Sequence, residues 1–493
     1  MEGQILLLFP VVFPILAGIL VLAGRRLCTD KRLASLTTAA VLLLQLGLVF
    51  AAVVKGGSLT LWKLTDTISL TLRVDGISRL FAVLTSGVWL LAAVYSVSYL
   101  SHEERVSRFC GFYLIVEGVL TGLDFAADLI TMYVFFEMMT LTSLPLVLHE
   151  QTREAVRAGM KYLFYSVAGA FLALFGIFFL AGVSGGTTFA PGGILTDAAL
   201  SGREGLLLAA SFCMILGFGV KAGMFPLHGW LPTAHPVAPA PASAVLSGLI
   251  TKSGVLAIIR TVYYVIGADR IRGSWVQYVW ILLSLLTVFM GSMLAYKEPV
   301  MKKRLAYSTV SQVSYILFGL SLLQPAAFVG ALSHIVFHSL IKNALFFIAG
   351  AIIVITGKTR VSDMRRLGRF MPLTLGCYTI VSLALVGIPP ASGFISKWYL
   401  AAGALASDTG AFRVIGPVTL LLSALLTAGY LLPLTVSGFF PGADSAAEEE
   451  ITGCEPSMWM LGPIALLTAG SLVFGCFPGP LLTALASIAA SVL

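Results

Sequence analysis

Long apolar segments separated by short polar stretches recur along almost the entire chain. Apolar runs of roughly twenty residues are typical of transmembrane helices, whereas the strands of a membrane β-barrel would be shorter and would alternate. About fourteen such runs can be counted, and the last is interrupted near Pro478 and Pro480. They cover residues 5–24, 33–54, 77–99, 109–126, 127–148, 158–182, 206–233, 241–266, 274–296, 303–323, 326–356, 372–402, 414–439 and 459–490. The pattern predicts an all-α integral membrane protein with about fourteen transmembrane helices.

Spans 7 and 12 of this count contain helix-breaking residues in their middle. Pro226 and Pro232 lie in the first, and Pro389 and Pro390 in the second. A proline removes a backbone donor and clashes with the preceding turn, so both helices are expected to break. Broken helices near the midplane mark ion sites in many transporters. Because the two breaks are five spans apart, the spacing suggests two copies of a five-helix unit, the second inverted.

Composition and charge agree with this class. Of 493 residues, 58% are hydrophobic and 11% charged, and the net charge is +8; soluble domains carry about 25% charged residues. The positive charge does not indicate nucleic-acid binding, because most Lys and Arg residues lie between spans. The loops after odd-numbered spans hold about twice as many as the even loops, with which Arg260 is counted. The positive-inside rule therefore places the odd loops in the cytoplasm of a prokaryotic cell and both termini outside.

A few charged residues lie within the apolar runs. They are Lys221, Lys252, Lys342, Lys397 and Glu137, with Glu117 as a further candidate. A charge at mid-bilayer costs several kcal/mol, so such residues usually mark an ion or proton pathway. The alternatives are that each snorkels to an interface or forms a static ion pair. Snorkelling is difficult for Lys252 and Lys342, which lie well inside their spans.

Glu137 and Lys221 carry opposite charges on different helices. If they are adjacent, they would titrate as a coupled pair, and burial opposes the charged forms. The sequence leaves open whether they touch. A lysine held in this balance is a suitable proton carrier.

His334, His338 and Lys342 are spaced at i, i+4 and i+8. This spacing places them along one face of a helix, about 6 Å apart in rise. Histidine titrates near physiological pH and can pass a proton through either ring nitrogen. We interpret the group as a proton relay; a hydrogen-bonded core histidine is the alternative for either ring alone.

The stretch VKAGMFPLHGWLPTAHP, residues 220–236, combines Lys221, Pro226 and His228 in one span. A break at Pro226 would let water reach Lys221, and His228 could pass the proton onward. Alternatively, Pro226 kinks the helix for packing and His228 caps the freed carbonyl groups.

No site for electrons or nucleotides is evident. The six cysteines are scattered, without a C-x-x-C pair, and there is no Walker A or dinucleotide-binding motif. We therefore expect no cofactor, no metal and no redox reaction in this chain.

Five stretches resemble the antiporter-like subunits of respiratory complex I, membrane-bound hydrogenases and Mrp-type sodium/proton antiporters. They are FFEMMTLTSLPL around Glu137, KAGMFPLHGWLPTAHPVAPAPASAVLSGLITKSG from Lys221, KRLAYSTVSQVSY from Lys303, HIVFHSLIKNALFFIAG from His334 and GIPPASGFISKWYL from Gly387. The resemblance covers roughly residues 70–440. It implies fourteen helices, with spans 4–8 and 9–13 as inverted repeats. The expected segments are 1–108, 109–266, 274–439 and 459–493.

The resemblance also implies roles for individual residues. Glu137 and Lys221 match a glutamate–lysine pair of spans 5 and 7, and Lys252 matches a lysine that connects toward the centre. His334 and His338 match the histidines of span 11, and Lys397 a terminal lysine of span 12. Protons are thought to move along this axis, coupled to partner subunits in the membrane. The acidic loop at 442–450 could contact a partner, although a solvated loop is the simpler interpretation.

Three functions compete. The first is a proton-translocating subunit of a redox-driven pump, the second a subunit of a secondary Mrp-type sodium/proton antiporter, and the third a solitary solute permease. Sodium prefers oxygen ligands, whereas the intramembrane set here is mostly lysine and histidine. This favours protons along this chain and leaves sodium to a neighbouring subunit. No pocket for an organic solute can be located in the sequence, which disfavours the permease.

Overall fold

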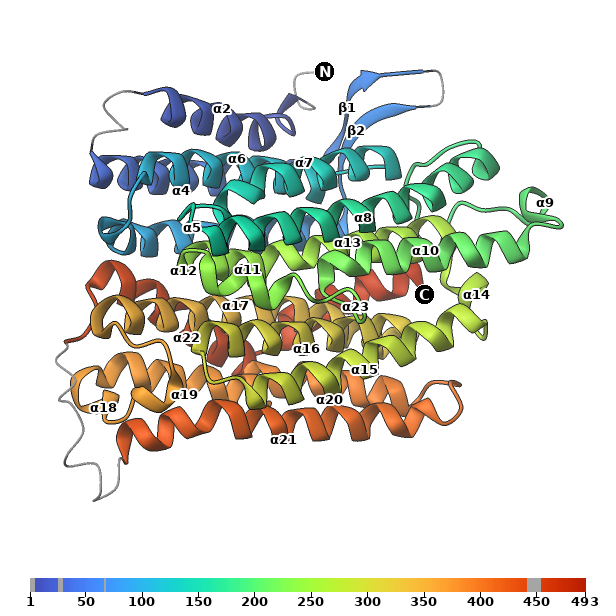
Figure 1. Ribbon diagram of the computed structural model, residues 1–493. Coiled ribbons are helices and arrows are strands. Elements are labelled where there is room, and N and C mark those ends of the chain that lie inside the picture. The colour runs from blue at the N-terminus through green and yellow to red at the C-terminus, as the bar shows by residue number, and fades with distance from the viewer. Residues whose placement is uncertain (1–4, 25–29, 66–67, 441–453) are drawn as a thin grey trace.

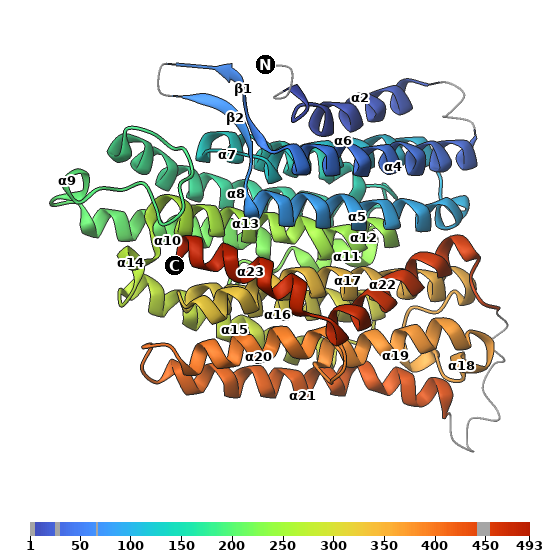
Figure 2. The same ribbon diagram turned by 180° about the vertical axis from the view of Figure 1, so that it is seen from behind.

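The computed structural model describes residues 5–24, 30–65, 68–440 and 454–493, and it is nearly all-helical. The helices lie side by side with their axes roughly parallel, as the horizontal ribbons of Figures 1 and 2 show. The acidic stretch at 442–450 lies outside the described residues. Eleven described helices are long and apolar enough to cross a membrane, and three apolar helices are shorter. The expected all-α membrane fold is confirmed, and the count of fourteen crossings stays a prediction.

The first half of the chain contains ten principal elements. They are α2 (Phe9–Ala23), α4 (Lys31–Lys55), β1 (Gly57–Lys63), β2 (Ser69–Val74), α5 (Gly76–Tyr99), α6 (Val106–Asp124), α7 (Leu129–Val147), α8 (Arg153–Ser184), α9 (Asp197–Leu200) and α10 (Glu204–Ala222). The strands β1 and β2 form an antiparallel hairpin that the apolar pattern did not predict. In Figure 1 the hairpin protrudes from the helical bundle, close to the N-terminus.

The second half begins with the short helices that follow the first break. It contains α11 (Leu231–Val237), α12 (Ala240–Val245), α13 (Thr251–Thr261), α14 (Ala268–Ile271), α15 (Trp275–Lys297), α16 (Met301–Ser321), α17 (Pro325–Thr356), α18 (Leu367–Phe370), α19 (Pro372–Val386), α20 (Ser392–Leu405), α21 (Phe412–Phe439), α22 (Met458–Cys476) and α23 (Gly479–Val492). The last apolar run is thus two helices, which meet at Phe477 and Pro478.

Two π-helical segments interrupt span 8. They are η2 (Leu246–Ile250), between α12 and α13, and η3 (Val262–Ile266), after α13. The run from α12 to η3 is fully buried, so it forms the centre of the bundle. Single π-helical turns within α-helices are frequent at functional sites.

The two expected helix breaks are present and are built alike. Helix α10 ends at Ala222 and α19 at Val386, each followed by a glycine with positive φ, Gly223 and Gly387. Glycine adopts this left-handed conformation without the steric cost of a Cβ atom. Each helix therefore ends at its glycine cap, and the prolines that follow prevent its continuation. The inverted repeat itself stays a prediction.

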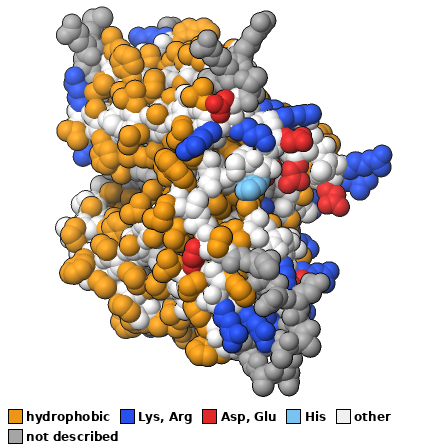
Figure 3. Space-filling view, turned by 90° about the vertical axis from the view of Figure 1, so that its left-hand side faces the viewer, with side chains coloured by type: hydrophobic (Ala, Val, Ile, Leu, Met, Phe, Trp, Pro, Cys, Tyr) orange, Lys and Arg blue, Asp and Glu red, His pale blue; other side chains and the backbone are white. Residues whose placement is uncertain are grey.

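Lys and Arg side chains gather at one end of the bundle. Figure 3 looks at this end and shows the basic residues between apolar surfaces. Arg260, counted with the even loops and the span ends that flank them, lies within α13 and is only 2% exposed. Its guanidinium pairs with Asp75, the N-cap residue of α5, at 2.6 Å. Burial favours the protonated form of Asp75, but the Arg260 charge and hydrogen bonds outweigh it and hold the pKa below its usual value.

Candidate functional site

Lys221 lies in the last turn of α10 and is 1% exposed. Its ammonium donates hydrogen bonds to three hydroxyl oxygens: Thr140 Oγ1 at 2.9 Å, Tyr162 OH at 2.9 Å and Ser166 Oγ at 3.0 Å. We call these three residues of α7 and α8 the hydroxyl cradle. Three donors and three acceptors match, so the cradle satisfies the hydrogen-bonding capacity of a buried ammonium. Snorkelling is excluded for this lysine in the described structure.

Glu137 does not form an ion pair with Lys221 among the described residues. It is half-buried on α7, beside the exposed Met138 and Leu141, and its Oε1 atom is buried without a hydrogen bond. Thr140 follows Glu137 by three residues, so the two side chains occupy neighbouring positions on one face of α7. In the described structure Lys221 is therefore held by hydroxyl groups, and no hydrogen bond or ion pair joins it directly to Glu137.

The loop between α10 and α11 holds Pro226 and His228. The Phe225–Pro226 peptide bond is cis, and the His228 ring stacks on Phe225 with centroids 6.0 Å apart. His228 does not cap the freed end of α10, because the Trp230 indole donates to the Val220 carbonyl oxygen at 2.8 Å. The Nδ1 atom of His228 is instead buried without a partner in the described structure. No described hydrogen bond joins His228 to Lys221.

Pro232 does not break a helix, contrary to expectation. It lies in the first turn of α11, where the missing backbone N–H would be unpaired in any case. In the second break, Pro389 and Pro390 form the turn between α19 and α20 and are joined by a cis bond.

Lys252 and His338 meet at the centre of the bundle. Lys252 is 2% exposed and His338 is fully buried. The Lys252 Nζ atom lies 2.7 Å from His338 Nδ1 and donates to the Ser247 carbonyl oxygen at 2.6 Å. Ser247 belongs to the π-helical segment η2, whose altered geometry presents this carbonyl to a lysine five residues further on.

The line of polar side chains continues along α17 to α20. The rings of His338 and His334 stack with centroids 5.8 Å apart, and His334 Nδ1 lies 2.8 Å from Ser396 Oγ. Lys397 follows Ser396 and donates to the carbonyl oxygens of Leu385 and Val386, the freed end of α19, at 2.6 and 2.9 Å. We call Lys252, His338, His334, Ser396 and Lys397 the central row.

Lys342 leaves this row, although it is fully buried on the same helix. Its ammonium donates to Ser308 Oγ at 2.7 Å and to the Leu305 carbonyl oxygen at 3.0 Å, both in α16. Eight residues correspond to about 80° of rotation beyond two full turns, because an α-helix has 3.6 residues per turn. The expectation of one common face is therefore correct for the two histidines and incorrect for the Lys342 side chain.

Close backbone packing connects the lysines of spans 7 and 8. A Cβ atom at Gly254 would lie 2.5 Å from the Phe218 carbonyl oxygen, 2.9 Å from the Ala222 nitrogen and 3.1 Å from Lys221 Cβ. Helices α10 and α13 thus touch at Gly254, two residues from Lys252. Only glycine permits this approach.

Three further polar residues are buried: His235 and Lys302, which had no role in the sequence analysis, and Glu117, which was named there only as a further candidate. His235 in α11 is fully buried, has no hydrogen bond on either ring nitrogen in the described structure, and stacks on Phe346 at 5.0 Å. Lys302, assigned to a loop, is 8% exposed and donates to the Ala238 carbonyl oxygen at 3.0 Å. Glu117 is fully buried and accepts from Ser86 Oγ at 2.7 Å. The signal available for His235 was its proline-rich context, and that for Glu117 was a charge inside an apolar run.

Metal binding finds no support in the described residues, where no group of three or more His, Cys, Asp or Glu side chains could hold an ion. The lysines of the site cannot serve as cation ligands while protonated, because an ammonium has no free lone pair. What the arrangement can do chemically is hold and transfer protons between buried bases.

Comparison with known proteins identifies the family to which the chain is similar. Residues 126–440 match the family described as "NADH:quinone oxidoreductase/Mrp antiporter, TM", and residues 62–110 match "NADH-Ubiquinone oxidoreductase (complex I), chain 5 N-terminus". A subunit of the NADH-quinone oxidoreductase of Desulforudis audaxviator is 32% identical over 82% of each chain. A subunit of the Na(+)/H(+) antiporter of Bacillus subtilis is 30% identical over 95% of this chain and 93% of its own.

A solved structure agrees with these matches. A chain of the Mrp complex from Dietzia sp. DQ12-45-1b superimposes with a TM-score of 0.84 at 25% identity, over all of this chain and 98% of that one. The chain is thus a multi-pass membrane protein that belongs to the NADH:quinone oxidoreductase/Mrp antiporter family.

Proposed function

We propose that the chain is a proton-translocating, antiporter-like subunit of a redox-driven membrane pump related to complex I or to membrane-bound hydrogenases. One observation carries the proposal: the central row, in which Lys252, His338, His334 and Ser396 follow one another in the protein core. Uncompensated charge in this environment is costly, which favours one transferable proton over several fixed charges.

Proton transfer along the row would proceed in short steps. The ammonium of Lys252 can give a proton to His338 Nδ1 at 2.7 Å. A histidine can accept a proton on one nitrogen and release it from the other, and one water molecule could bridge the 5.8 Å between the ring centroids of His338 and His334. Ser396 and Lys397 then lead to the broken helix formed by α19 and α20.

Lys221 would serve the first half of the path. A proton released from its ammonium enters the hydroxyl cradle and reaches Glu137 by way of Thr140. The break around Pro226, where the Nδ1 atom of His228 has no hydrogen-bond partner in the described structure, would give water access to this region. On the other side, Gly254 brings the helix of Lys252 against that of Lys221. Lys342 adds a third buried ammonium, held by Ser308.

Lys302 and His235 would supply the row with protons. Lys302 lies in the first turn of α16, near the loop that joins it to α15. Lys302 donates to the carbonyl oxygen of Ala238, which follows α11 and lies three residues beyond His235. The two unpaired nitrogens of His235 suit a side chain that transfers protons.

The proposed setting is a multisubunit complex in a prokaryotic plasma membrane, with both termini outside. Relatives carry names of complex subunits, and the basic end of the bundle in Figure 3 suits the cytoplasmic side by the positive-inside rule. Partners are other membrane subunits and the lipid bilayer, sodium would belong to a neighbouring subunit, and we propose no cofactor for this chain.

A second candidate is a subunit of a secondary Mrp-type sodium/proton antiporter. The specific observation in its favour is the nearly end-to-end match to the B. subtilis antiporter, whereas the match to the D. audaxviator oxidoreductase covers 82% of this chain. The central row would carry protons in both kinds of complex, which differ in the reaction that drives transport.

The deciding experiment measures proton and sodium flux in inverted vesicles that contain the native complex. Wild type, Lys221→Ala and Glu137→Ala are compared, first with the redox substrate and then with only an imposed sodium gradient. Lys297→Ala, on the exposed end of α15, is the matched control. Flux that requires redox turnover and is lost in the Lys221 and Glu137 variants supports the pump, whereas flux driven by sodium alone supports the antiporter. Normal flux in both variants would contradict the proposal.

A further inference from the structure

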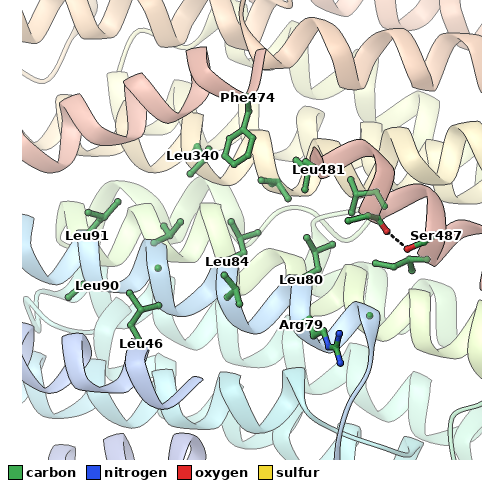
Figure 4. Close-up of a pocket in the computed structure, with 18 residues that line it drawn as sticks. Leu46, Arg79, Leu80, Leu84, Leu90, Leu91, Leu340, Phe474, Leu481 and Ser487 are labelled. Carbon is green, nitrogen blue, oxygen red and sulfur yellow. Dashed lines mark hydrogen bonds between the residues drawn. The ribbon is translucent and has the colours of Figure 1, made fainter. Parts of the chain in front are cut away.

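A long apolar groove lies on the face formed by α4, α5, α22 and α23. Its volume is about 710 Å³. Figure 4 shows the lining leucines projecting from α5 on one side and Leu340, Phe474 and Leu481 on the other. The groove is separate from the central row and shares no lining residue with it among the described residues.

The break between α22 and α23 creates this space. Helix α22 packs against α5, but Phe477 and Pro478 interrupt the run and α23 takes a different direction. Phe474, at the end of α22, closes the groove above, and Ile488 of α23 approaches the start of α5 at Gly76. The floor is formed by buried side chains, among them Val88 and Val336.

The part of the groove beyond Arg79 is about as long as one leaflet is deep. The groove runs along α5 from Gly76 to Leu91, and the twelve residues from Arg79 to Leu91 rise about 18 Å. One leaflet of hydrocarbon is about 15 Å deep, half of the roughly 30 Å core. An occupant that begins at Arg79 would therefore end near the bilayer midplane.

Arg79 supplies the only charged group among the described lining residues. It lies in the first turn of α5, is exposed, and its guanidinium forms no hydrogen bond or ion pair in the described part of the chain. The end of α4 with Lys55 lies at the same place, because a Cβ atom at Gly56 would be 3.8 Å from Arg79 Nη2. A guanidinium with free donors is matched to a phosphate group, which it can bind through two parallel hydrogen bonds.

We propose that this groove is a binding site for one anionic phospholipid, whose phosphate pairs with Arg79 and whose acyl chain fills the channel along α5. A soluble anion would leave the apolar channel uncovered, and an apolar helix of a partner would leave the guanidinium unpaired. Basic pockets between transmembrane helices bind anionic headgroups by the same chemistry.

The test uses the intact complex in vesicles that contain phosphatidylglycerol or phosphatidylcholine with a photoreactive acyl chain. After illumination, the labelled peptides are mapped. We expect labelling of residues 76–91 and 479–492, stronger with phosphatidylglycerol by about fivefold, since one basic residue contributes about 1 kcal/mol to such binding.

Two variants separate charge from space. Arg79→Gln is expected to abolish the preference for the anionic lipid, with Arg413→Gln as a surface control on α21. No atom lies within 4 Å of a Cβ atom at Gly87, so Gly87→Leu is expected to occupy part of the groove and to lower labelling by both lipids. Gly47→Leu, equally open on α4 but outside the lining, is its control.

Three results would overturn the proposal. Equal labelling by both lipids in the wild type excludes recognition of the phosphate charge, as does a preference that persists in Arg79→Gln. Absence of label from residues 76–91 and 479–492 in the assembled complex would mean that a partner protein covers the groove.

Discussion

Lys252 Nζ and His338 Nδ1 lie 2.7 Å apart in the core of the bundle, and the contact joins α13 to α17. The distance is that of a strong hydrogen bond, and only one of the two groups needs to carry the proton. Lys252 is held from the other side by a carbonyl group of a π-helical turn, so its position does not depend on His338. In the proposed pathway, this pair is the point at which a proton passes from one half of the chain to the other.

Replacing His338 with glutamine tests this transfer. Glutamine retains a polar group for Lys252 but cannot accept and release a proton. We expect proton translocation to fall by at least about tenfold while the complex assembles normally, as measured by dye quenching in inverted vesicles and by native gel electrophoresis. His102→Gln, at an exposed position, should leave the rate unchanged. A His338→Gln variant with wild-type translocation would remove His338 from the pathway.

Tyr162→Phe removes one of the three oxygens that hold Lys221. The hydroxyl accepts from Lys221 and also pairs with Ser143 at 2.7 Å, so its loss leaves both partners short of a hydrogen bond. A hydrogen bond to a charged group contributes about 1.5–3 kcal/mol, and we expect the transport rate to fall roughly tenfold. Tyr165→Phe, one turn away on the same helix, is the control. Equal rates for the two variants would show that the cradle is not required.

Gly254→Ala should separate the helices that carry Lys221 and Lys252. The new methyl group would lie 2.5 Å from the Phe218 carbonyl oxygen, and overpacking of this kind costs typically about 1–3 kcal/mol. We expect a lower unfolding temperature in detergent and slower proton translocation. Gly182→Ala, on α8 with no atom within 4 Å of its Cβ, should be neutral or slightly stabilising. The close approach would have no functional role if Gly254→Ala destabilised the protein but transported normally.

The Asp75–Arg260 pair predicts a pH-dependent contribution to stability. The pKa of Asp75 is lowered in the folded protein, so the pair stabilises above about pH 4, and this contribution is lost as the pH falls through the folded pKa. Asp75→Asn should therefore unfold at a lower temperature than wild type at pH 7, and the difference should narrow below about pH 4. Asp269→Asn removes an exposed ion pair and should have little effect at either pH. A difference that is independent of pH would contradict the assignment.

The sequence predicted much of the fold, because membrane insertion imposes a direct rule on composition. Apolar length located the helices, and the prolines around Pro226 and Pro389 located both breaks. The hairpin of β1 and β2 was not predicted, because two short strands give a weak sequence pattern beside such long apolar runs. The π-helical segment at Ser247 was also not predicted, because its formation depends on packing and not on local helix propensity.

The candidate site was predicted less completely. The sequence identified the buried lysines and histidines by their cost in a bilayer, and the structure brings Lys252, His338 and His334 together. It could not identify Tyr162 or Thr140 as partners of Lys221, because hydroxyl groups in apolar helices are common and carry no charge to mark them. Arg260 was counted with the loop charges because it lies near the end of its apolar run, and its ion pair with Asp75, which is distant in the sequence, explains its burial.

Proton translocation by a Lys252→Met variant tests the account most directly. Methionine keeps the apolar stem of the side chain but removes the ammonium group that contacts His338. Inverted vesicles containing the native complex are energised, and acidification is compared for wild type, Lys252→Met and the surface control Lys297→Met. We predict that Lys252→Met assembles fully and loses translocation, whereas Lys297→Met retains it. Translocation at the wild-type rate in an assembled Lys252→Met complex would contradict the proposal that protons pass along the central row.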